Sequence, residues 1–229
     1  MSLAASIPPV HRAGLQAVLF DMDGLLIDSE PLWFEVERGI MAELGGEWGP
    51  ADQLALVGGS LARSVDYLLS RAIRQASPDE VGRWMVDGMA AMLRERGVAV
   101  LPGARELLAE VASAGIPRAL VTSAERKIME VALPSIGAAF DVLVCAEDVQ
   151  SPKPDPEPYL RAAALLGAEP AHCVVLEDSP NGVAAGEAAG CLVVAVPGLV
   201  PIPTRPGRVV AGSLAQVDLG MLRGMVSGA

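Results

Sequence analysis

Residues 17–30 read Ala17-Val-Leu-Phe-Asp21-Met-Asp23-Gly24-Leu-Leu-Ile-Asp28-Ser29-Glu30. The apolar residues before Asp21 predict a buried strand over about residues 16–21, which ends at two carboxylates and a glycine. In an open parallel α/β sheet, ligands bind at the carboxyl ends of the strands. Asp21 and Asp23 can both face such a site if the backbone turns between them, which Gly24 permits. Carboxylate oxygens in this position suit Mg²⁺.

The same stretch has two other interpretations. A surface loop with solvated carboxylates fits the Asp-x-Asp-Gly pattern equally well when the pattern is taken alone. A calcium-binding loop does not fit, because its fifth, sixth and twelfth positions would be Leu25, Leu26 and Leu32. These residues supply neither the ligand oxygens nor the glycine that the loop requires. The choice between a solvated loop and a magnesium site therefore depends on the rest of the chain.

The composition sets broad limits on the fold and on the binding partners. A chain of 229 residues, 52% of them hydrophobic, can bury a large core as one domain, or as one domain with a smaller one inserted. A formal net charge of −11 disfavours general binding to nucleic acid or to anionic membranes. The same charge repels phosphorylated molecules, so a site for one of them requires a local cation.

Targeting signals and catalytic thiols are not evident in the sequence. The chain has no apolar run of the roughly 18 residues that a membrane helix needs. Residues 1–14 lack the apolar segment of a signal peptide and predict a flexible tail, so we expect a cytoplasmic protein. Cys145, Cys173 and Cys191 have no Cys-x-x-Cys spacing and are predicted to be buried thiols.

Helical periodicity dominates the residues that follow the opening stretch. Apolar residues recur at helical spacing over residues 31–44, 60–73 and 77–97, and a polar link is expected around residues 48–59. The third helix begins with a capping box, Ser77-Pro78-Asp79-Glu80. We therefore expect residues 30–101 to form an inserted α-helical cap domain.

From residue 102 onward, helix and strand patterns alternate. Predicted strands cover residues 117–122, 141–145, 173–177, 192–196 and 208–210; helices are predicted between them and over residues 213–226. This alternation predicts a Rossmann-like α/β fold, in which a doubly wound parallel sheet carries helices on both faces. Its core would comprise residues 15–29 and 102–229, and the cap would interrupt the first crossover.

Three later segments carry polar groups that could face the same site. Thr122 and Ser123 end one predicted strand where a helix begins, which favours an anion. Lys153 lies between two prolines, in a stretch with little conformational freedom, and suits the neutralisation of phosphate. Glu177 and Asp178 end another buried strand. Taken singly, each group has an ordinary structural explanation as a helix cap or a surface charge.

Taken together, these groups indicate a metal-dependent phosphoryl-transfer site. The strand ends would gather three or four carboxylates, a hydroxyl and a lysine at one edge of the sheet. Such an acidic cluster repels itself unless a divalent cation and Lys153 balance its charge. The combination favours the magnesium site over the solvated loop.

The order of these motifs resembles that of the haloacid dehalogenase-like superfamily. Asp21-Met-Asp23-Gly24, Thr122, Lys153 and Glu177-Asp178 carry the resemblance, which spans about residues 16–200. The chain is more closely similar to the branch of small sugar-phosphate phosphatases and β-phosphoglucomutases. The resemblance implies a helical cap that closes over the site, excludes water and selects the leaving group.

The resemblance also implies a role for each site residue. Asp21 would be the nucleophile that forms an aspartyl phosphate, and Asp23 would be the general acid and base. Mg²⁺ would be held by Asp21, the Asp23 carbonyl and Asp178, with Glu177 supporting the metal site or ligating the ion. The phosphoryl oxygens would be held by Thr122, Ser123 and Lys153.

Rival activities occur within the same superfamily. Its dehalogenases lack the second aspartate, so Asp23 disfavours that reaction. Its mutases carry a histidine shortly after the first motif and an arginine in the cap; here the corresponding places are Trp33 and Leu61, with Arg63 nearby. We therefore expect a phosphatase, with a β-phosphoglucomutase-type phosphosugar mutase as the alternative. A catalytically silent phosphate-binding module is less favoured, because binding alone does not need both a nucleophile and a proton donor.

The expected substrate is a small phosphorylated metabolite, namely a sugar or polyol phosphate monoester. We expect no nucleic acid or membrane partner, and a monomer or weak homodimer. For the apolar cap residues, helical spacing favours core packing over substrate contact; these residues are Trp33, Trp84, Met85, Met89 and Met92.

Overall fold

The computed structural model describes residues 14–205 and 207–228. The tail predicted over residues 1–14 therefore lies, apart from Gly14, outside the described residues. Within them, six parallel strands form one sheet in the order β3-β2-β1-β4-β5-β6. The strands are β1 (Ala17–Phe20), β2 (Arg118–Val121), β3 (Val142–Val144), β4 (Cys173–Glu177), β5 (Leu192–Ala195) and β6 (Arg208–Val210). The predicted parallel α/β sheet is confirmed.

Helices cover both faces of the sheet, as the alternating side chains of its strands require. In β1, Val18 and Phe20 belong to one hydrophobic cluster, whereas Ala17 and Leu19 belong to the other. The first cluster includes apolar residues of α5 (Ala104–Ser113), α6 (Arg126–Ile136) and α9 (Leu219–Ser227). The second includes residues of α7 (Glu157–Leu166) and α8 (Pro180–Ala188). The sheet is therefore doubly wound, as predicted.

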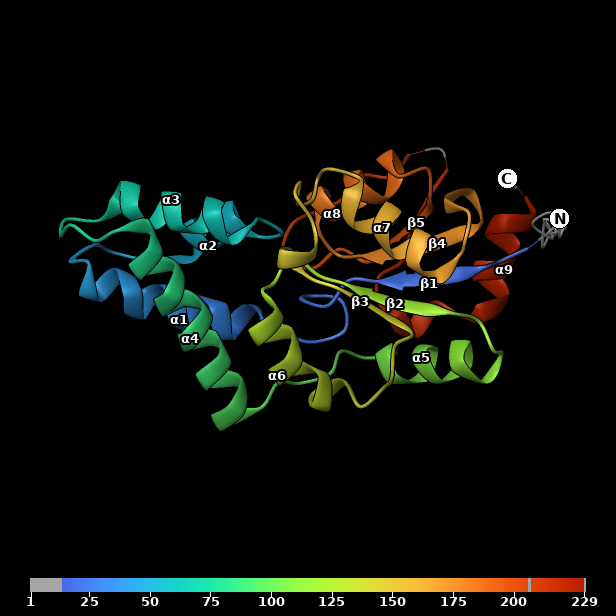
Figure 1. The fold of residues 1–229 in the computed structure, drawn as a ribbon, viewed down its shortest axis with the longest axis horizontal. Helices are drawn as coiled ribbons and strands as arrows, with labels where there is room; N and C mark the ends of the chain where they lie inside the picture. The colour runs from blue at the N-terminus through green and yellow to red at the C-terminus, as the bar shows by residue number, and fades with distance from the viewer. Residues whose placement is uncertain (1–13, 206, 229) are drawn as a thin grey trace, which may run out of the picture.

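Four helices between β1 and α5 lie together beyond the carboxyl ends of the strands (Figure 1). They are α1 (Glu30–Glu43), α2 (Pro50–Leu56), α3 (Leu61–Arg71) and α4 (Pro78–Arg96). We call residues 30–96 the helical insertion. The two segments that join it to the sheet run side by side: the Asp28 N–H donates to the Ala99 carbonyl, and the Leu101 N–H donates to the Leu26 carbonyl, both at 2.9 Å. The insertion thus leaves and rejoins the sheet at neighbouring positions.

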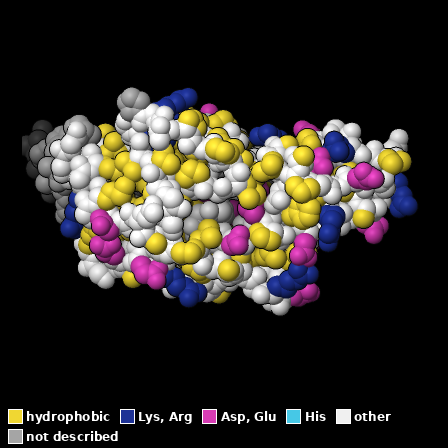
Figure 2. Space-filling view, turned by 180° about the vertical axis from the view of Figure 1, so that it is seen from behind, with side chains coloured by type: hydrophobic (Ala, Val, Ile, Leu, Met, Phe, Trp, Pro, Cys, Tyr) yellow, Lys and Arg dark blue, Asp and Glu magenta, His cyan; other side chains and the backbone are white. Residues whose placement is uncertain are grey.

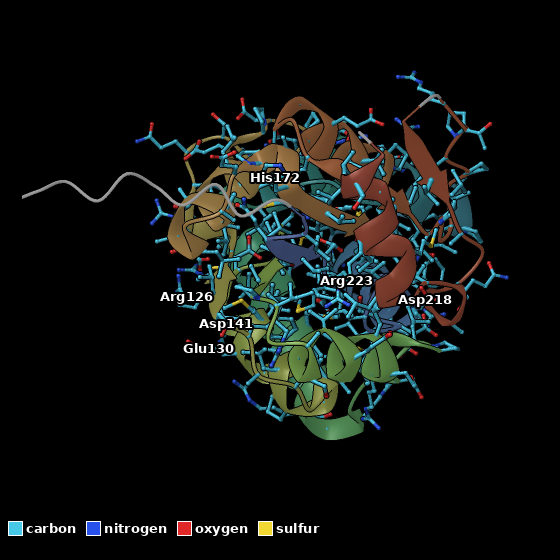
Figure 3. All side chains as sticks on the ribbon, turned by 90° about the vertical axis from the view of Figure 1, so that its right-hand side faces the viewer. Arg126, Glu130, Asp141, His172, Asp218 and Arg223 are labelled. Carbon is cyan, nitrogen blue, oxygen red and sulfur yellow. The ribbon has the colours of Figure 1, made fainter. Side chains whose placement is uncertain are left out.

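Two details of the sequence-based helix prediction are wrong. The link expected around residues 48–59 contains α2, whose Pro50 occupies the first turn and whose Asp52 carboxylate accepts a hydrogen bond from the Gly49 N–H at 2.9 Å. The single helix expected over residues 213–226 is instead a short 3₁₀ turn (Leu214–Gln216) followed by α9. Asp218 caps α9 by accepting a hydrogen bond from the Met221 N–H at 2.7 Å, and Figure 3 shows it where that helix begins.

The surface charges are mixed in sign, and the cysteines are buried. Acidic and basic side chains are interspersed over the face shown in Figure 2. No helix in the described part of the chain has the length and apolar character needed to span a membrane. Cys145, Cys173 and Cys191 are buried and free, as predicted. His172, labelled in Figure 3, immediately precedes β4. Asp178 directly follows β4, so the two residues lie at opposite ends of that strand.

Candidate active site

The predicted site residues converge where β1, β2 and β4 end. Asp21 directly follows β1, and its N–H donates to the Leu176 carbonyl of β4 at 3.1 Å. Thr122 directly follows β2, and its N–H donates to the Val144 carbonyl of β3 at 2.9 Å. Because β1 pairs with β2 on one side and β4 on the other, side chains from three strand ends meet at one edge. The strand order reverses at this position, where open α/β sheets bind ligands.

Lys153 links two of these strand ends. Its ammonium lies 2.6 Å from Asp21 Oδ1 and 2.6 Å from Glu177 Oε1, and it donates to the Val121 carbonyl at 2.9 Å. The residue is 5% exposed. Burial alone would lower the pKa of Lys153, but the two carboxylates outweigh burial and raise it. The site therefore holds a permanently charged ammonium beside Asp21.

The loop that carries Lys153 is fixed by its own hydrogen bonds. The Glu157 carboxylate, at the start of α7, accepts from the backbone N–H groups of Gln150 and Ser151 at 2.9 and 2.8 Å. The Lys153–Pro154 peptide bond is cis. The two hydrogen bonds to Glu157 fix the loop that carries the lysine without help from a ligand.

Glu177 is fully buried, and both of its oxygens are occupied by donors. Oε1 accepts from Lys153 and from the Tyr159 hydroxyl at 2.6 Å, while Oε2 accepts from the N–H groups of Asp178 and Ser179 and from the Ser179 hydroxyl. A Cβ on Gly182 would overlap this carboxylate, so the start of α8 approaches it closely. Glu177 is thus arranged to position Lys153 and Asp178. Tyr159, on the buried face of α7, was not predicted from the sequence as a site residue.

Three buried carboxylates form a cluster that fits a divalent cation. Asp21, Glu177 and Asp178 each offer an oxygen, and these oxygens lie within 4.8 Å of one another. Burial, followed by the neighbouring carboxylates, raises the pKa of both Asp21 and Asp178 well above the usual range. One lysine cannot neutralise three such groups, and carboxylate oxygens are the donors that Mg²⁺ prefers. The residues present therefore fit a magnesium ion.

Gly24 allows the chain to turn inside this cluster. Its φ is +75°, and a Cβ at this position would overlap Oδ2 of Asp178. Both the backbone conformation and the space thus require glycine. The turn directs Asp23 back toward the strand ends, as the sequence predicted.

Asp23 is held by two hydroxyl groups. Its Oδ1 accepts from the Ser29 hydroxyl at 2.6 Å and its Oδ2 from the Thr122 hydroxyl at 3.3 Å. Thr122 in turn accepts from the Ala124 N–H at 3.0 Å. Burial raises the pKa of Asp23, although its hydrogen bonds oppose the rise. A carboxyl in this environment is suited to carrying a proton. Ser29 was not predicted from the sequence as a site residue, because its contact with Asp23 depends on the turn at Gly24.

A cavity of about 100 Å³ lies between the strand ends and the helical insertion. From the sheet side it is lined by Asp21, Asp23, Thr122, Ser123, Lys153 and Asp178, so these six predicted site residues share one space. From the insertion side, Glu30, Trp33 and Glu37 of α1 line it at helical spacing.

Two of the apolar residues expected to pack in the core, Trp33 and Met85, border this cavity. Trp84 is 42% exposed, so its predicted core position is wrong.

The helical insertion also contacts the sheet domain directly. The Asn181 side chain, at the start of α8, donates to the Gly58 carbonyl at 3.0 Å, and Lys127 of α6 pairs with Asp87 of α4 at 2.6 Å. Arg63, the arginine nearest to the place expected in a mutase, instead donates to the Ala55 carbonyl at 2.7 Å and does not line the cavity.

Comparisons with known proteins agree with this geometry. A family model described as haloacid dehalogenase-like hydrolase matches residues 18–196. Hexitol phosphatase B of Escherichia coli K12 is 36% identical over 184 residues, which cover 79% of this chain and 83% of that protein. Hexitol phosphatase A of the same organism is 38% identical over 186 residues, covering 78% and 81%.

A solved structure extends the likeness to the whole fold. CbbY from Rhodobacter sphaeroides, in complex with xylulose-(1,5)bisphosphate, superposes with a TM-score of 0.82 at 27% identity. The match covers 91% of this chain and 99% of that one. The family match, the relatives and the converging strand-end residues lead to one conclusion: the chain belongs to the haloacid dehalogenase-like hydrolases.

Proposed function

We propose that this protein is a Mg²⁺-dependent phosphatase that hydrolyses a small phosphorylated metabolite through an aspartyl phosphate on Asp21. The main support is that Asp21, Asp23, Thr122 and Lys153 line one cavity at the carboxyl edge of the sheet. The relatives named hexitol phosphatases suggest a sugar or polyol phosphate monoester as substrate.

In the first step, the Asp21 carboxylate attacks phosphorus and displaces the alcohol of the substrate. Both reactants are anionic, so the attack requires positive charge nearby. Lys153, whose ammonium is 2.6 Å from Asp21, is placed to neutralise phosphoryl oxygens. Thr122 and Ser123 lie on the same wall of the cavity and can hold those oxygens by hydrogen bonds.

Asp23 is assigned the proton transfers of both steps. It would give a proton to the leaving oxygen and later take one from the water that attacks the aspartyl phosphate. A raised pKa favours the protonated form that the first step requires. General acid and base catalysis of this kind contributes about 10²–10⁴ in rate.

The acidic cluster would hold the metal ion. Asp21, the Asp23 carbonyl and Asp178 would be its ligands, and Glu177 would orient the cluster through Lys153 and the N–H groups of Asp178 and Ser179. When bound, Mg²⁺ supplies positive charge that stabilises the phosphoryl oxygens in the transition state.

We further propose that residues 30–101 form a cap domain over a core of residues 15–29 and 102–229. The bonds between Asn181 and Gly58 and between Lys127 and Asp87 hold the helical insertion against the sheet domain. A cap in this position excludes water from the intermediate and contacts the leaving group.

Water, rather than a second sugar phosphate, is the proposed acceptor. A mutase must hold a second phosphate in the cavity, which requires a further basic group. Among the described residues that line the cavity, Lys153 is the only basic one. Trp33 and Leu61 line the cavity. By the resemblance described above, they stand at the places where the mutases carry a histidine and an arginine.

Phosphate release from a panel of phosphorylated metabolites, measured with Mg²⁺, tests this function. We expect release from one or a few sugar or polyol phosphates and from a generic aryl phosphate. Conversion of β-glucose 1-phosphate to the 6-phosphate without net release would show a mutase instead. Failure to release phosphate from every compound would contradict the phosphatase assignment.

A further inference from the structure

Two of the three buried cysteines lie opposite each other on neighbouring strands. Cys173 is the first residue of β4, and Cys191 directly precedes β5. The two strands pair in parallel with Val174 opposite Leu192, so the register places Cys173 opposite Cys191. Both cysteines belong to the hydrophobic cluster on the side of the sheet that α7 and α8 cover. The two thiols therefore leave the same face of the sheet at adjacent positions.

This placement suits a covalent bond between the two sulfur atoms. Neighbouring strands lie about 4.7–4.9 Å apart, which is within the range of about 4.4–6.8 Å that Cα atoms span in disulfides. The thiols also interact in the reduced protein, because a hydrogen bond from Cys173 lowers the pKa of Cys191. The same contact, and then burial, raise the pKa of Cys173. The pair thus combines a suitable backbone spacing with direct contact between the thiols.

The two cysteines differ in their access to solvent. Cys191 is 8% exposed, whereas Cys173 is fully buried. The Glu169 carbonyl accepts the S–H of Cys173 at 3.3 Å, and this S–H can turn toward Cys191 when the Cys191 thiol ionises. Because the thiolate is the form of cysteine that reacts with oxidants, a small oxidant meets Cys191 first. Cys173 is then placed to react within the same molecule.

Cys145 provides a contrast, since it has no cysteine beside it. It directly follows β3, which β2 and β1 separate from β4 by roughly 14 Å. Its sulfur is 3.2 Å from a Glu147 oxygen and 3.1 Å from an Asp148 oxygen. Burial, followed by these two carboxylates, raises the pKa of Cys145 to about 12. Cys145 is therefore an unreactive thiol within the same protein.

We propose that Cys173 and Cys191 form a reversible redox site, in which a hydroperoxide oxidises the two thiols to a disulfide. The Cys191 thiolate attacks a peroxide oxygen, the O–O bond breaks, and Cys191 becomes a sulfenic acid while the other oxygen takes a proton and leaves. The Cys173 sulfur then attacks the sulfenic sulfur. The S–S bond forms, the S–O bond breaks, and the oxygen leaves as water with the proton of Cys173. The two sulfurs together lose the two electrons that the peroxide gains.

The redox site lies away from the candidate active site. Cys173 and Asp178 lie at opposite ends of β4, roughly 16 Å apart for five residues of extended chain. Neither Cys173 nor Cys191 lines the cavity between the strand ends and the helical insertion. The inference is therefore independent of the proposed phosphatase function, and it can be tested without a substrate.

Peroxide treatment of the folded wild-type protein tests the inference. After a few equivalents of hydrogen peroxide, the remaining thiols are alkylated in denaturant, and the chain is digested without reductant by a protease that cleaves after glutamate. Cleavage at Glu177 and Glu187 separates the two cysteines, so that mass spectrometry can detect a bond between their peptides. We expect one cross-linked pair that joins Cys173 to Cys191 and that dithiothreitol dissociates.

The same digests show which thiols react and how fast. We expect the Cys191 thiol to be lost at least about tenfold faster than that of Cys145, which should remain alkylated. Three results would each overturn the inference: an unreacted Cys191, a Cys191 oxidised to sulfinic acid without a cross-link, or a cross-link to a second molecule.

Serine variants test the order of the two steps. Cys173→Ser should stop the reaction at a sulfenic acid on Cys191, which dimedone traps. Cys191→Ser should leave Cys173 as a thiol, because Cys173 is shielded from the oxidant. Cys145→Ser is the matched control and should form the cross-link at the wild-type rate. A dimedone adduct on Cys173 in Cys191→Ser would contradict Cys191 as the residue attacked first.

Discussion

At the scale of single residues, Asp21 is the proposed nucleophile, and its negative charge is also unfavourable at its buried position. Its pKa is raised by burial and by the neighbouring Glu177 and Asp23, against the pull of Lys153. The ionised form therefore weakens the fold at neutral pH unless a metal ion is present. Such a trade between stability and function is common at catalytic sites.

Asp21→Asn separates these two effects. We expect turnover to fall by at least about 10³-fold, because the amide is not a nucleophile. The free energy of unfolding without metal should stay the same or rise, since one buried negative charge is removed and Lys153 keeps Glu177 as a partner. Phosphate-release kinetics and urea unfolding measure the two quantities. Turnover within tenfold of the wild type would exclude Asp21 as the nucleophile.

Glu37 makes the stability of the fold depend on pH. Its pKa rises from 4.5 to about 8 on folding, mainly through burial, so the folded state binds the proton more tightly than the unfolded state. The stability linked to this proton is complete below pH 4.5 and is lost as the pH rises through 8. The loss is on the order of a few kcal/mol.

Glu37→Gln cannot lose this proton. We therefore expect the free energy of unfolding of the variant, relative to that of the wild type, to increase as the pH is raised from 5 to 9. Urea titrations at several pH values measure the difference. Parallel curves for the two proteins would show that Glu37 is not protonated in the folded state at neutral pH.

Except for Lys153, the site residues that the sequence predicted lie within three residues of a strand end. Asp21, Thr122 and Asp178 are examples, because strand ends of a parallel sheet meet at one edge whatever the details of the loops. Ser29, Tyr159 and Glu37 were missed. Their contacts depend on how a turn, a helix face and the inserted helices pack in three dimensions, and a single sequence does not carry that information.

At the scale of elements, the junction between the helical insertion and the sheet domain depends on Gly58. This residue has φ +67°, its carbonyl accepts from Asn181, and a Cβ on it would lie 2.5 Å from Ser179 Cβ. The loop after α2 therefore packs directly on the start of α8, beside the acidic cluster. The insertion can take this position only with glycine at this point.

Gly58→Ala should disturb this junction. We expect kcat/KM for a polyol phosphate to fall by about tenfold or more, because both the backbone strain and the clash push the insertion away from the site. Gly39→Ala, in α1 with open space around its Cβ position, is the control and should keep full activity. Equal kcat/KM values for the two variants would show that contact at Gly58 does not govern the reaction.

Element boundaries were predicted well where capping residues and periodicity agreed, as in α4, whose capping box forms as expected. Helix α2 was missed because a helix of seven residues carries too little periodicity to stand out from a polar link. The C-terminal helix was predicted as one piece, because apolar residues continue across Asp218, which in fact begins a new helix.

At the scale of the whole molecule, the net charge of −11 and the acidic cavity oppose the binding of phosphorylated substrates. A divalent cation reverses this field locally. Mg²⁺ should therefore act on stability as well as on activity, because the proposed ion would bind the folded cluster of Asp21 and Asp178 and relieve their repulsion.

Chelation and re-addition of Mg²⁺ test both effects. We expect EDTA to abolish turnover and Mg²⁺ to restore it, and we expect Mg²⁺ to raise the melting temperature of the wild type. Asp178→Asn should lose most of the Mg²⁺-dependent rise, whereas Asp79→Asn, in the exposed first turn of α4, should keep it. Full activity in EDTA would exclude the metal assignment.

Asp23→Asn offers the most direct way to trap the proposed covalent intermediate on Asp21. An aryl phosphate has a good leaving group, so transfer to Asp21 needs no acid, whereas hydrolysis of the intermediate still lacks its base. We expect a burst of aryl alcohol close to one equivalent per enzyme. Borohydride reduction followed by peptide mass spectrometry should find homoserine at position 21. Steady release without a burst, or reduction at another residue, would contradict Asp21 as the nucleophile.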